Sequence, residues 1–187
     1  MDLGIELPPF SIFFHQPNIS LPYTYIEMLH ADINFTIEEQ NAILKAAEAW
    51  EYFSNGLFRI VIAFDYNPNE ERNVGTDGTI VKATANHKDV VRADGYYQIN
   101  CWGLCAYRKD SVRDLYLVAD RIGNEMRSFS AVAMHEIGHY LWLPRITGSG
   151  VMHPNRYDVL FPTEADAIEY AGRYGLRKDD FRYFLRF

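Results

Sequence analysis

Residues 131–142 read Ala131-Val132-Ala133-Met134-His135-Glu136-Ile137-Gly138-His139-Tyr140-Leu141-Trp142. This stretch contains the pattern His-Glu-x-x-His. Residues four apart lie on one face of an α-helix, so His135 and His139 can point at a single metal ion. Glu136 stands beside them, where it can accept a proton from a water that the metal activates. We therefore expect a helix with a polar, metal-binding face.

The other side of this helix carries apolar residues, namely Met134, Ile137, Gly138 and Leu141. An apolar face opposite a polar one is typical of a helix that packs against a core. The pattern alone also fits a plain helix that shows two histidines and a glutamate to solvent. Two segments further along the chain favour the metal site.

The order of these two segments is informative. Residues 149–154 read Ser-Gly-Val-Met-His-Pro, and residues 161–170 read Phe-Pro-Thr-Glu-Ala-Asp-Ala-Ile-Glu-Tyr, ending in Arg173-Tyr174-Gly175. With the His-Glu-x-x-His helix they resemble the metzincin metalloproteases, and within them the matrixins. That family has His-Glu-x-x-His-x-x-Gly-x-x-His, then a turn whose methionine lies beneath the zinc. Met152 matches this methionine, and the resemblance extends over residues 115–175 and back to residue 23.

The resemblance implies a fold and an activity. The fold is an α+β, zincin-like single domain, with a twisted, mixed and mostly parallel sheet, two main helices and a C-terminal helix. The activity is that of a zinc endopeptidase acting on a peptide or protein substrate, with Glu136 as the catalytic base and His135 and His139 as metal ligands. In matrixins the strand at the place of residues 115–120 forms the sheet edge that holds the substrate extended.

Two residues depart from the family pattern. Trp142 stands where the family has the glycine that turns the chain, and Arg145 stands where it has the third zinc ligand. An arginine has no lone pair to donate to zinc, whereas a catalytic zinc normally has three protein ligands. Either another residue completes the set or the chain is a degenerate zincin.

Several residues are candidates for the replacement ligand. His153 is nearest, but astacins carry a histidine at the same place that is not a ligand. Glu164 loosely fits the later glutamate of thermolysin-like zincins, although it also fits the matrixin closing helix. His15 and His30 could arrive only through tertiary contacts. No third ligand is identified, and a site of two histidines would bind zinc weakly.

Arg145 has a predicted role of its own. Its guanidinium is expected to occupy or shield the third-ligand position and to pair with a carboxylate, with Glu136 as a candidate partner. A cation ~4 Å from a zinc ion would be repelled by about 4 kcal/mol at an intermediate dielectric. Arg145 should therefore swing out when zinc binds, or exclude zinc.

Composition limits the expected partners, the location and the state of the cysteines. The chain has 187 residues, 48% of them hydrophobic, and a net charge of −7. It lacks a basic run, so nucleic acid is not an expected partner, and it lacks an apolar run long enough for a membrane. No signal peptide is recognised, which favours an intracellular location or one within an assembly. Cys101 and Cys105 fit packed thiols better than a small-loop disulfide, and a zinc site of two cysteines least.

Three segments are expected. Residues 1–22 form an extended N-terminal arm, residues 23–175 the zincin-like domain, and residues 176–187 an aromatic C-terminal extension. The arm and the extension carry apolar and aromatic residues outside the recognisable domain. Both are therefore expected to contact protein partners.

Local patterns predict the secondary structure. Helices are expected at 37–54, with a capping box at Thr36 and Glu39, at 129–142, capped by Ser128 or Ser130, and from Thr163 onward. Strands are expected at 23–29, 57–66, 79–84, 96–100 and 115–120.

Two functions remain open. The intact His-Glu-x-x-His favours a zinc endopeptidase. Arg145, Trp142 and the apolar termini favour a degenerate zincin-like structural or binding protein with weak or no peptidase activity. Such a protein would be part of a larger assembly, for example a virus particle.

Overall fold

A five-stranded sheet forms the centre of the fold. Its strands are β1 (Tyr25–Asp32), β2 (Phe58–Tyr66), β3 (Gly78–Ala83), β4 (Gly103–Tyr107) and β5 (Arg113–Val118), in the order β2-β1-β3-β5-β4. Only β4 runs antiparallel to its neighbour, β5. The computed structural model describes residues 25–70, 77–97, 100–107, 112–123, 125–154 and 159–183. The prediction of a mixed, mostly parallel sheet is confirmed, and β2 and β5, which overlap the predicted strands 57–66 and 115–120, belong to this one sheet.

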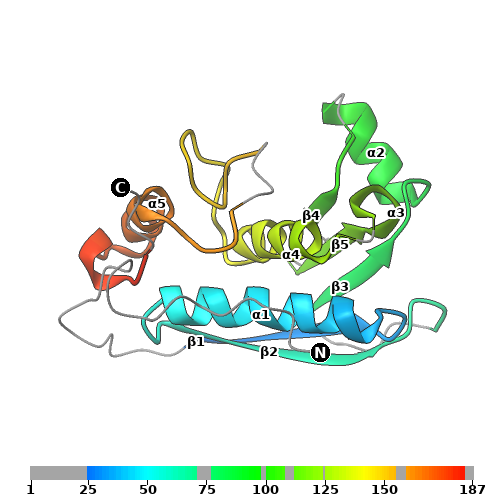
Figure 1. Cartoon of the computed structure of the whole chain (residues 1–187), viewed down its shortest axis with the longest axis horizontal. Helices are drawn as coiled ribbons and strands as arrows, with labels where there is room; N and C mark the ends of the chain where they lie inside the picture. The colour runs from blue at the N-terminus through cyan, green and yellow to red at the C-terminus, as the bar shows by residue number, and fades with distance from the viewer. Residues whose placement is uncertain are drawn as a thin grey trace.

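Five α-helices accompany the sheet in these described ranges. They are α1 (Ile37–Phe53), α2 (Lys88–Tyr97), α3 (Ala119–Ile122), α4 (Met126–Tyr140) and α5 (Glu164–Tyr174), followed by the 3₁₀ turn η1 (Lys178–Asp180). Figure 1 shows α1 lying along β1 and β2, while α5 and α2 lie at opposite ends of the molecule. The chain is thus a mixed α+β single domain, as predicted.

The predicted helix 37–54 is α1, and its start has the expected chemistry. Thr36 Oγ1 accepts a hydrogen bond from the Glu39 main-chain N–H at 3.3 Å, and Glu39 Oε2 accepts one from the Thr36 N–H at 2.7 Å. The helix packs on α4, where Trp50 Nε1 donates to the Met134 carbonyl at 2.8 Å. This bond links the two main helices through the core.

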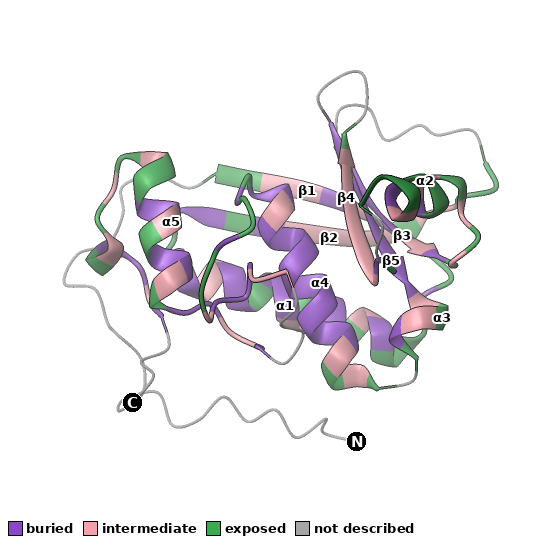
Figure 2. Cartoon of the chain, turned by 90° about the horizontal axis from the view of Figure 1, so that it is seen from above, coloured by how far each residue is buried: buried purple, intermediate pink, exposed green. Residues whose placement is uncertain are grey.

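Two strand predictions are wrong. Residues 96 and 97 end the helix α2 instead of opening a strand, and the strand after it, β4, was not predicted. The segment predicted as the sheet edge, 115–120, lies mostly in β5, which pairs with β3 on one side and β4 on the other. The edge of the sheet on this side is therefore β4, which lies next to α2 (Figure 2).

The start of the His-Glu-x-x-His helix also differs from the prediction. The helix α4 begins at Met126, and its N-cap residue is Glu125, so neither Ser128 nor Ser130 caps it. Ser128 Oγ instead donates to the Glu125 carboxylate at 3.0 Å. The added first turn is held by the core, because Met126 packs against it in a partly buried position.

The described part of the C-terminal extension packs on its own domain. Phe181 is fully buried, and its ring stacks on Phe53 at 5.3 Å between centroids. The Arg182 N–H donates to the Phe53 carbonyl at 2.9 Å, and Tyr183 is buried as well. Residues 176–183 thus enlarge the core. Residues 184–187 and the predicted arm 1–22 lie outside the described residues, and their partner contacts stay a prediction.

Cys101 and Cys105 are free thiols, so the predicted packed pair describes them better than a disulfide. None of the helices seen in the described ranges is long and apolar enough to cross a membrane.

Candidate metal centre

Main-chain carbonyls orient the two histidines of α4. His135 Nδ1 lies 2.8 Å from the Val151 oxygen, and His139 Nδ1 lies 2.7 Å from the Leu143 oxygen. A carbonyl oxygen can only accept, so each Nδ1 carries the proton. In a neutral imidazole this leaves the lone pair on Nε2, the nitrogen that would bind a metal. The two rings lie 4.7 Å apart, nearly perpendicular to one another.

Burial keeps both imidazoles neutral. It lowers the pKa of His135 to about 3, helped by the neighbouring charge of His139. Burial likewise lowers the pKa of His139. A metal ligand must be unprotonated, so both histidines are ready to donate at neutral pH.

Glu136 is buried, and its carboxylate lies against the edge strand. Burial raises its pKa to about 8, while the charge of Arg145 opposes that rise. Its Oε2 has no hydrogen-bond partner among the described residues. A Cβ on Gly103, the first residue of β4, would stand 2.6 Å from both Cγ and Oε1 of Glu136. Only glycine at 103 leaves this carboxylate its place, and an orphaned buried carboxyl group is a common mark of a functional site.

The turn around Met152 is fastened to the helix and to α5. Met152 is fully buried, and its sulfur occupies the space that a Cβ on Gly138 would need. Asp166 of α5 accepts hydrogen bonds from the main-chain N–H groups of Val151 at 3.0 Å and Met152 at 3.1 Å. Since Val151 also holds His135, this buried carboxylate sets the position of the first histidine indirectly.

Asp166 should be critical for stability. It also accepts from the main-chain N–H and the hydroxyl of Thr163, at 2.7 and 3.1 Å, so alanine there would leave three main-chain donors without a partner. We expect Asp166→Ala to lower the free energy of unfolding by about 3 to 5 kcal/mol, measured by urea denaturation. Glu48→Ala, which removes an exposed carboxylate from α1, should change it little. A loss below about 1 kcal/mol for Asp166→Ala would contradict this role.

Trp142, which stands where the resembled family has a glycine, has a backbone conformation that glycine adopts readily. Its φ is 68°, in the left-handed region that favours glycine. Its ring lies 3.5 Å from the guanidinium carbon of Arg113 and 5.6 Å from that of Arg173. Arg113 in turn donates to the His139 carbonyl at 2.6 Å. Cation–π contacts therefore stabilise a residue that the backbone disfavours.

This strain can be measured by comparing two truncations. Trp142→Gly and Trp142→Ala remove the same ring, but only glycine relieves the left-handed backbone. We expect the glycine variant to have the higher free energy of unfolding, by about 1 kcal/mol. For the control pair Glu48→Gly and Glu48→Ala, in the middle of α1, the alanine variant should have the higher free energy of unfolding. Equal stabilities at position 142 would show that the chain takes another conformation there.

Arg145 does not form the predicted pair with Glu136. Its guanidinium carbon lies 5.2 Å from the ring centroid of Tyr97, the last residue of α2. Its charge nevertheless affects Glu136 and both histidines, so it lies close to the site. The cation–π contact with Tyr97 takes the place of the expected ion pair.

Among the described residues, no third ligand lies with the two histidines. Within the described residues no three histidine, cysteine, aspartate or glutamate side chains form a group that could hold a metal. Glu164 is exposed and pairs with Lys178. His30 hydrogen-bonds Asp65 at 2.7 Å, and His15 lies outside the described residues. His153 affects the pKa of His135 but does not complete a ligand group.

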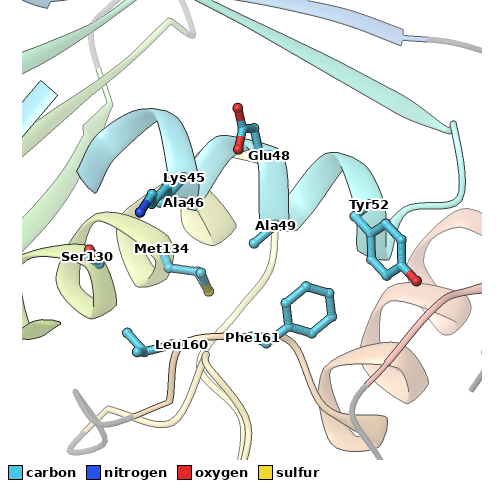
Figure 3. A pocket seen from close by; sticks show the side chains of 9 residues that line it. All are labelled: Lys45, Ala46, Glu48, Ala49, Tyr52, Ser130, Met134, Leu160 and Phe161. Atoms are coloured by element: carbon cyan, nitrogen blue, oxygen red, sulfur yellow. The ribbon is translucent and has the colours of Figure 1, made fainter. Parts of the chain in front are cut away.

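The site opens into a cleft of about 470 Å³. Its lining residues come from α2, the segment before β4, β4 itself, α4, the loop after α4, and α5: Tyr97, Cys101, Gly103, Leu104, Cys105, Tyr107, Glu136, His139, Trp142, Leu143, Pro144, Arg145 and Arg173. A smaller pocket of about 130 Å³ lies between α1 and α4, where the side chains of Met134 and Phe161 approach one another (Figure 3). Because this pocket contains none of the site residues, it is separate from the candidate metal centre.

The sequence predicted the three motif residues but not the residues from other elements that surround them. The sequence around Gly103 did carry a signal, because an isolated glycine in a β-prone stretch often marks a place where another group comes close to the backbone. No sequence signal marked Tyr97, Arg113 or Arg173, since they come from three elements that only the fold brings together.

Comparison of the chain with protein-family models and with curated proteins finds no match.

Proposed function

We propose that this chain is a zincin-like metallopeptidase in which His135 and His139 hold zinc and Glu136 acts as the general base. The observation that carries the proposal is the arrangement of α4. Both histidines donate Nδ1–H to main-chain carbonyls, and the carboxylate between them in sequence is buried with an orphaned oxygen. Such an arrangement suits metal binding and proton transfer. A buried carboxyl oxygen without a hydrogen-bond partner lowers the stability of the fold, so a structural role alone does not account for it.

The overall architecture supports the zincin-like part of the proposal. The helix that carries the motif packs against a mostly parallel sheet with one antiparallel edge strand, and the methionine turn comes after it. Met152 packs against Gly138 of that helix. These features agree with the family that the sequence motifs resemble.

Each residue of the site has its own role in the proposed reaction. Zinc, when bound, supplies the Lewis acidity that activates water and polarises a carbonyl group. The Glu136 carboxylate, which the raised pKa makes a stronger base once it is ionised, can accept the proton that the water loses and later give it to the leaving amine. Val151 and Leu143 fix the histidine tautomers through their carbonyls. Arg113 holds the carbonyl of His139 in turn.

The edge strand gives a place for the substrate. One side of β4 is unpaired in the described sheet, and Gly103, Leu104, Cys105 and Tyr107 of this strand line the cleft. A peptide in extended form can add to such an edge by main-chain hydrogen bonds. Its scissile bond would then pass Glu136, which lies against Gly103.

The second candidate is a degenerate zincin-like binding or structural protein in a larger assembly. The observation that favours it is the replacement of the third ligand by Arg145, which places a cation close to both histidines. A cation close to two metal ligands repels a metal ion and weakens its binding. A cleft that keeps its shape without zinc can still bind a protein partner.

Zinc binding separates the two candidates. With two protein ligands, isothermal titration of metal-free protein should give one site with a dissociation constant on the order of micromolar. His139→Gln should abolish it, while His30→Gln, a histidine paired with Asp65, should not. Zinc content together with zinc-dependent cleavage of a peptide library would support the peptidase. Failure to bind zinc at about 1 mM would favour the second candidate.

A further inference from the structure

The cleft beside Glu136 is cationic, although the chain as a whole carries a net charge of −7. Arg145 and Arg173 line it from the loop after α4 and from α5. Glu136 is the single carboxylic acid among the described lining residues. A positive cleft on an acidic protein gives a local potential that attracts anions.

Each of the two arginines has an aromatic ring as a neighbour, and Glu169 of α5 lies beside Arg173 in an adjoining hollow. Arg145 lies over Tyr97 at 5.2 Å, and Arg173 over Trp142 at 5.6 Å. In the part of the chain that the structure describes, neither forms an ion pair, and both side chains are exposed. A cation–π contact uses none of the N–H hydrogen-bond donors of a guanidinium, so the donors of these two exposed side chains stay available to a ligand.

Glu136 does not pair with either arginine. Its side chain is buried, and its carboxyl group lies against Gly103 of the edge strand, away from solvent. The described lining therefore holds two exposed cations and one buried carboxyl group. Arg145 is close enough to act electrostatically on His135, Glu136 and His139, so an anion bound by it would lie beside the site.

We propose that the cleft selects peptides with a carboxylate close to the bond at Glu136, and that Arg145 is the specificity-determining residue, assisted by Arg173. The inference rests on the proposed function, because it names the substrate class of that same site. Guanidinium groups bind carboxylates through two parallel hydrogen bonds, which gives both affinity and orientation. Tyr97, Tyr107 and Trp142 offer flat surfaces for the rest of the peptide.

The carboxylate can come from two sources with the same chemistry. An aspartate or glutamate side chain would make the site selective within a chain. A C-terminal carboxylate would make it selective for chain ends. Three matched peptides distinguish them: fluorescein-labelled alanine-rich decamers with a central Glu and an amidated end, a central Gln and an amidated end, and a central Gln and a free end.

Binding should be measured by fluorescence anisotropy with the full chain carrying Glu136→Gln, in the presence of EDTA. This variant stops turnover, and EDTA prevents a carboxylate from binding a metal. We expect the Glu peptide to bind about tenfold more tightly than the amidated Gln peptide, since hydrogen bonds to charged groups are strong. Arg145→Gln should remove most of the difference, and Arg173→Gln about half. Arg127→Gln, which removes an exposed arginine of α4 outside the cleft, should leave it unchanged.

Each outcome decides the proposal. A preference for the free-end peptide that Arg145→Gln removes supports carboxylate selection, with the chain end as its source. Equal binding of all three peptides, no binding of any, or equal effects of Arg145→Gln and Arg127→Gln would overturn it. Cleavage by the wild-type chain with zinc is a separate readout. Carboxylate-dependent binding without cleavage would remove the peptidase proposal and keep this one, whereas cleavage without a carboxylate preference would do the reverse.

Discussion

On the proposed function, replacing Glu136 with glutamine is expected to reduce peptide cleavage strongly and, at the same time, to stabilise the metal-free protein above neutral pH. The loss of cleavage results from the loss of the general base, whose contribution is typically about 10²–10⁴-fold, and we expect about a thousandfold fall in kcat. Zinc binding through His135 and His139 should persist, because glutamine fills the same space beside Gly103.

The gain in stability results from the raised pKa of Glu136. The folded protein keeps this proton up to about pH 8, whereas the unfolded chain loses it near pH 4.5. The folded state therefore binds more protons between these values, so the contribution to stability is fully present below pH 4.5 and is lost as the pH rises to about 8. The full difference amounts to roughly 5 kcal/mol.

Glutamine has no proton to lose, so Glu136→Gln should lack this slope. Urea denaturation in EDTA at several pH values between about 4.5 and 8 would show the variant gaining stability over the wild type as the pH rises. Glu48→Gln, at an exposed position of α1, is the control and should follow the wild-type curve. A constant difference between Glu136→Gln and the wild type would mean that the carboxyl group is already ionised in the folded protein.

Replacing Arg145 with histidine is expected to raise the affinity for zinc by on the order of a hundredfold. A third imidazole adds about 3 kcal/mol if the binding energy of a zinc site is shared among its ligands. The substitution also removes the cation whose charge acts on both histidines. Isothermal titration, or competition with a chelator, would measure the change.

Arg145→Gln separates the two contributions, because it removes the charge without adding a ligand. We expect it to raise zinc affinity only a few-fold, in line with a charge interaction through solvent. Equal affinities for the histidine and glutamine variants would show that residue 145 does not reach the metal, and that the ligand set is completed elsewhere.

Where the pattern was long and periodic, the sequence predicted the structure well. The helix α1 has a capping box and apolar residues at helical spacing, and β2 is a continuous β-prone run, so both were predicted nearly to the residue. Three short elements, α2, α3 and β4, were missed. The helix α2 contains Gly95 and ends in two tyrosines, residues that favour other structures, and tertiary contacts such as buried Val90 and Ala93 decide its form.

The candidate site was predictable only where one helix supplies it. His135, Glu136 and His139 share α4, so their spacing in the sequence fixes their arrangement. The position of Arg145 over Tyr97 and of Trp142 between two arginines depends on elements far apart in the chain. Helical spacing carries no information about such contacts, and the expected Arg145–Glu136 pair was wrong for this reason.

The carbonyl acceptors of His135 and His139 have a consequence for how this site can evolve. Every residue has a main-chain oxygen, so no substitution at Val151 or Leu143 deletes either hydrogen bond directly. The tautomers are thus robust to sequence drift in the shell around them. A histidine introduced at position 145 would therefore meet two imidazoles whose tautomers are already set by the main chain.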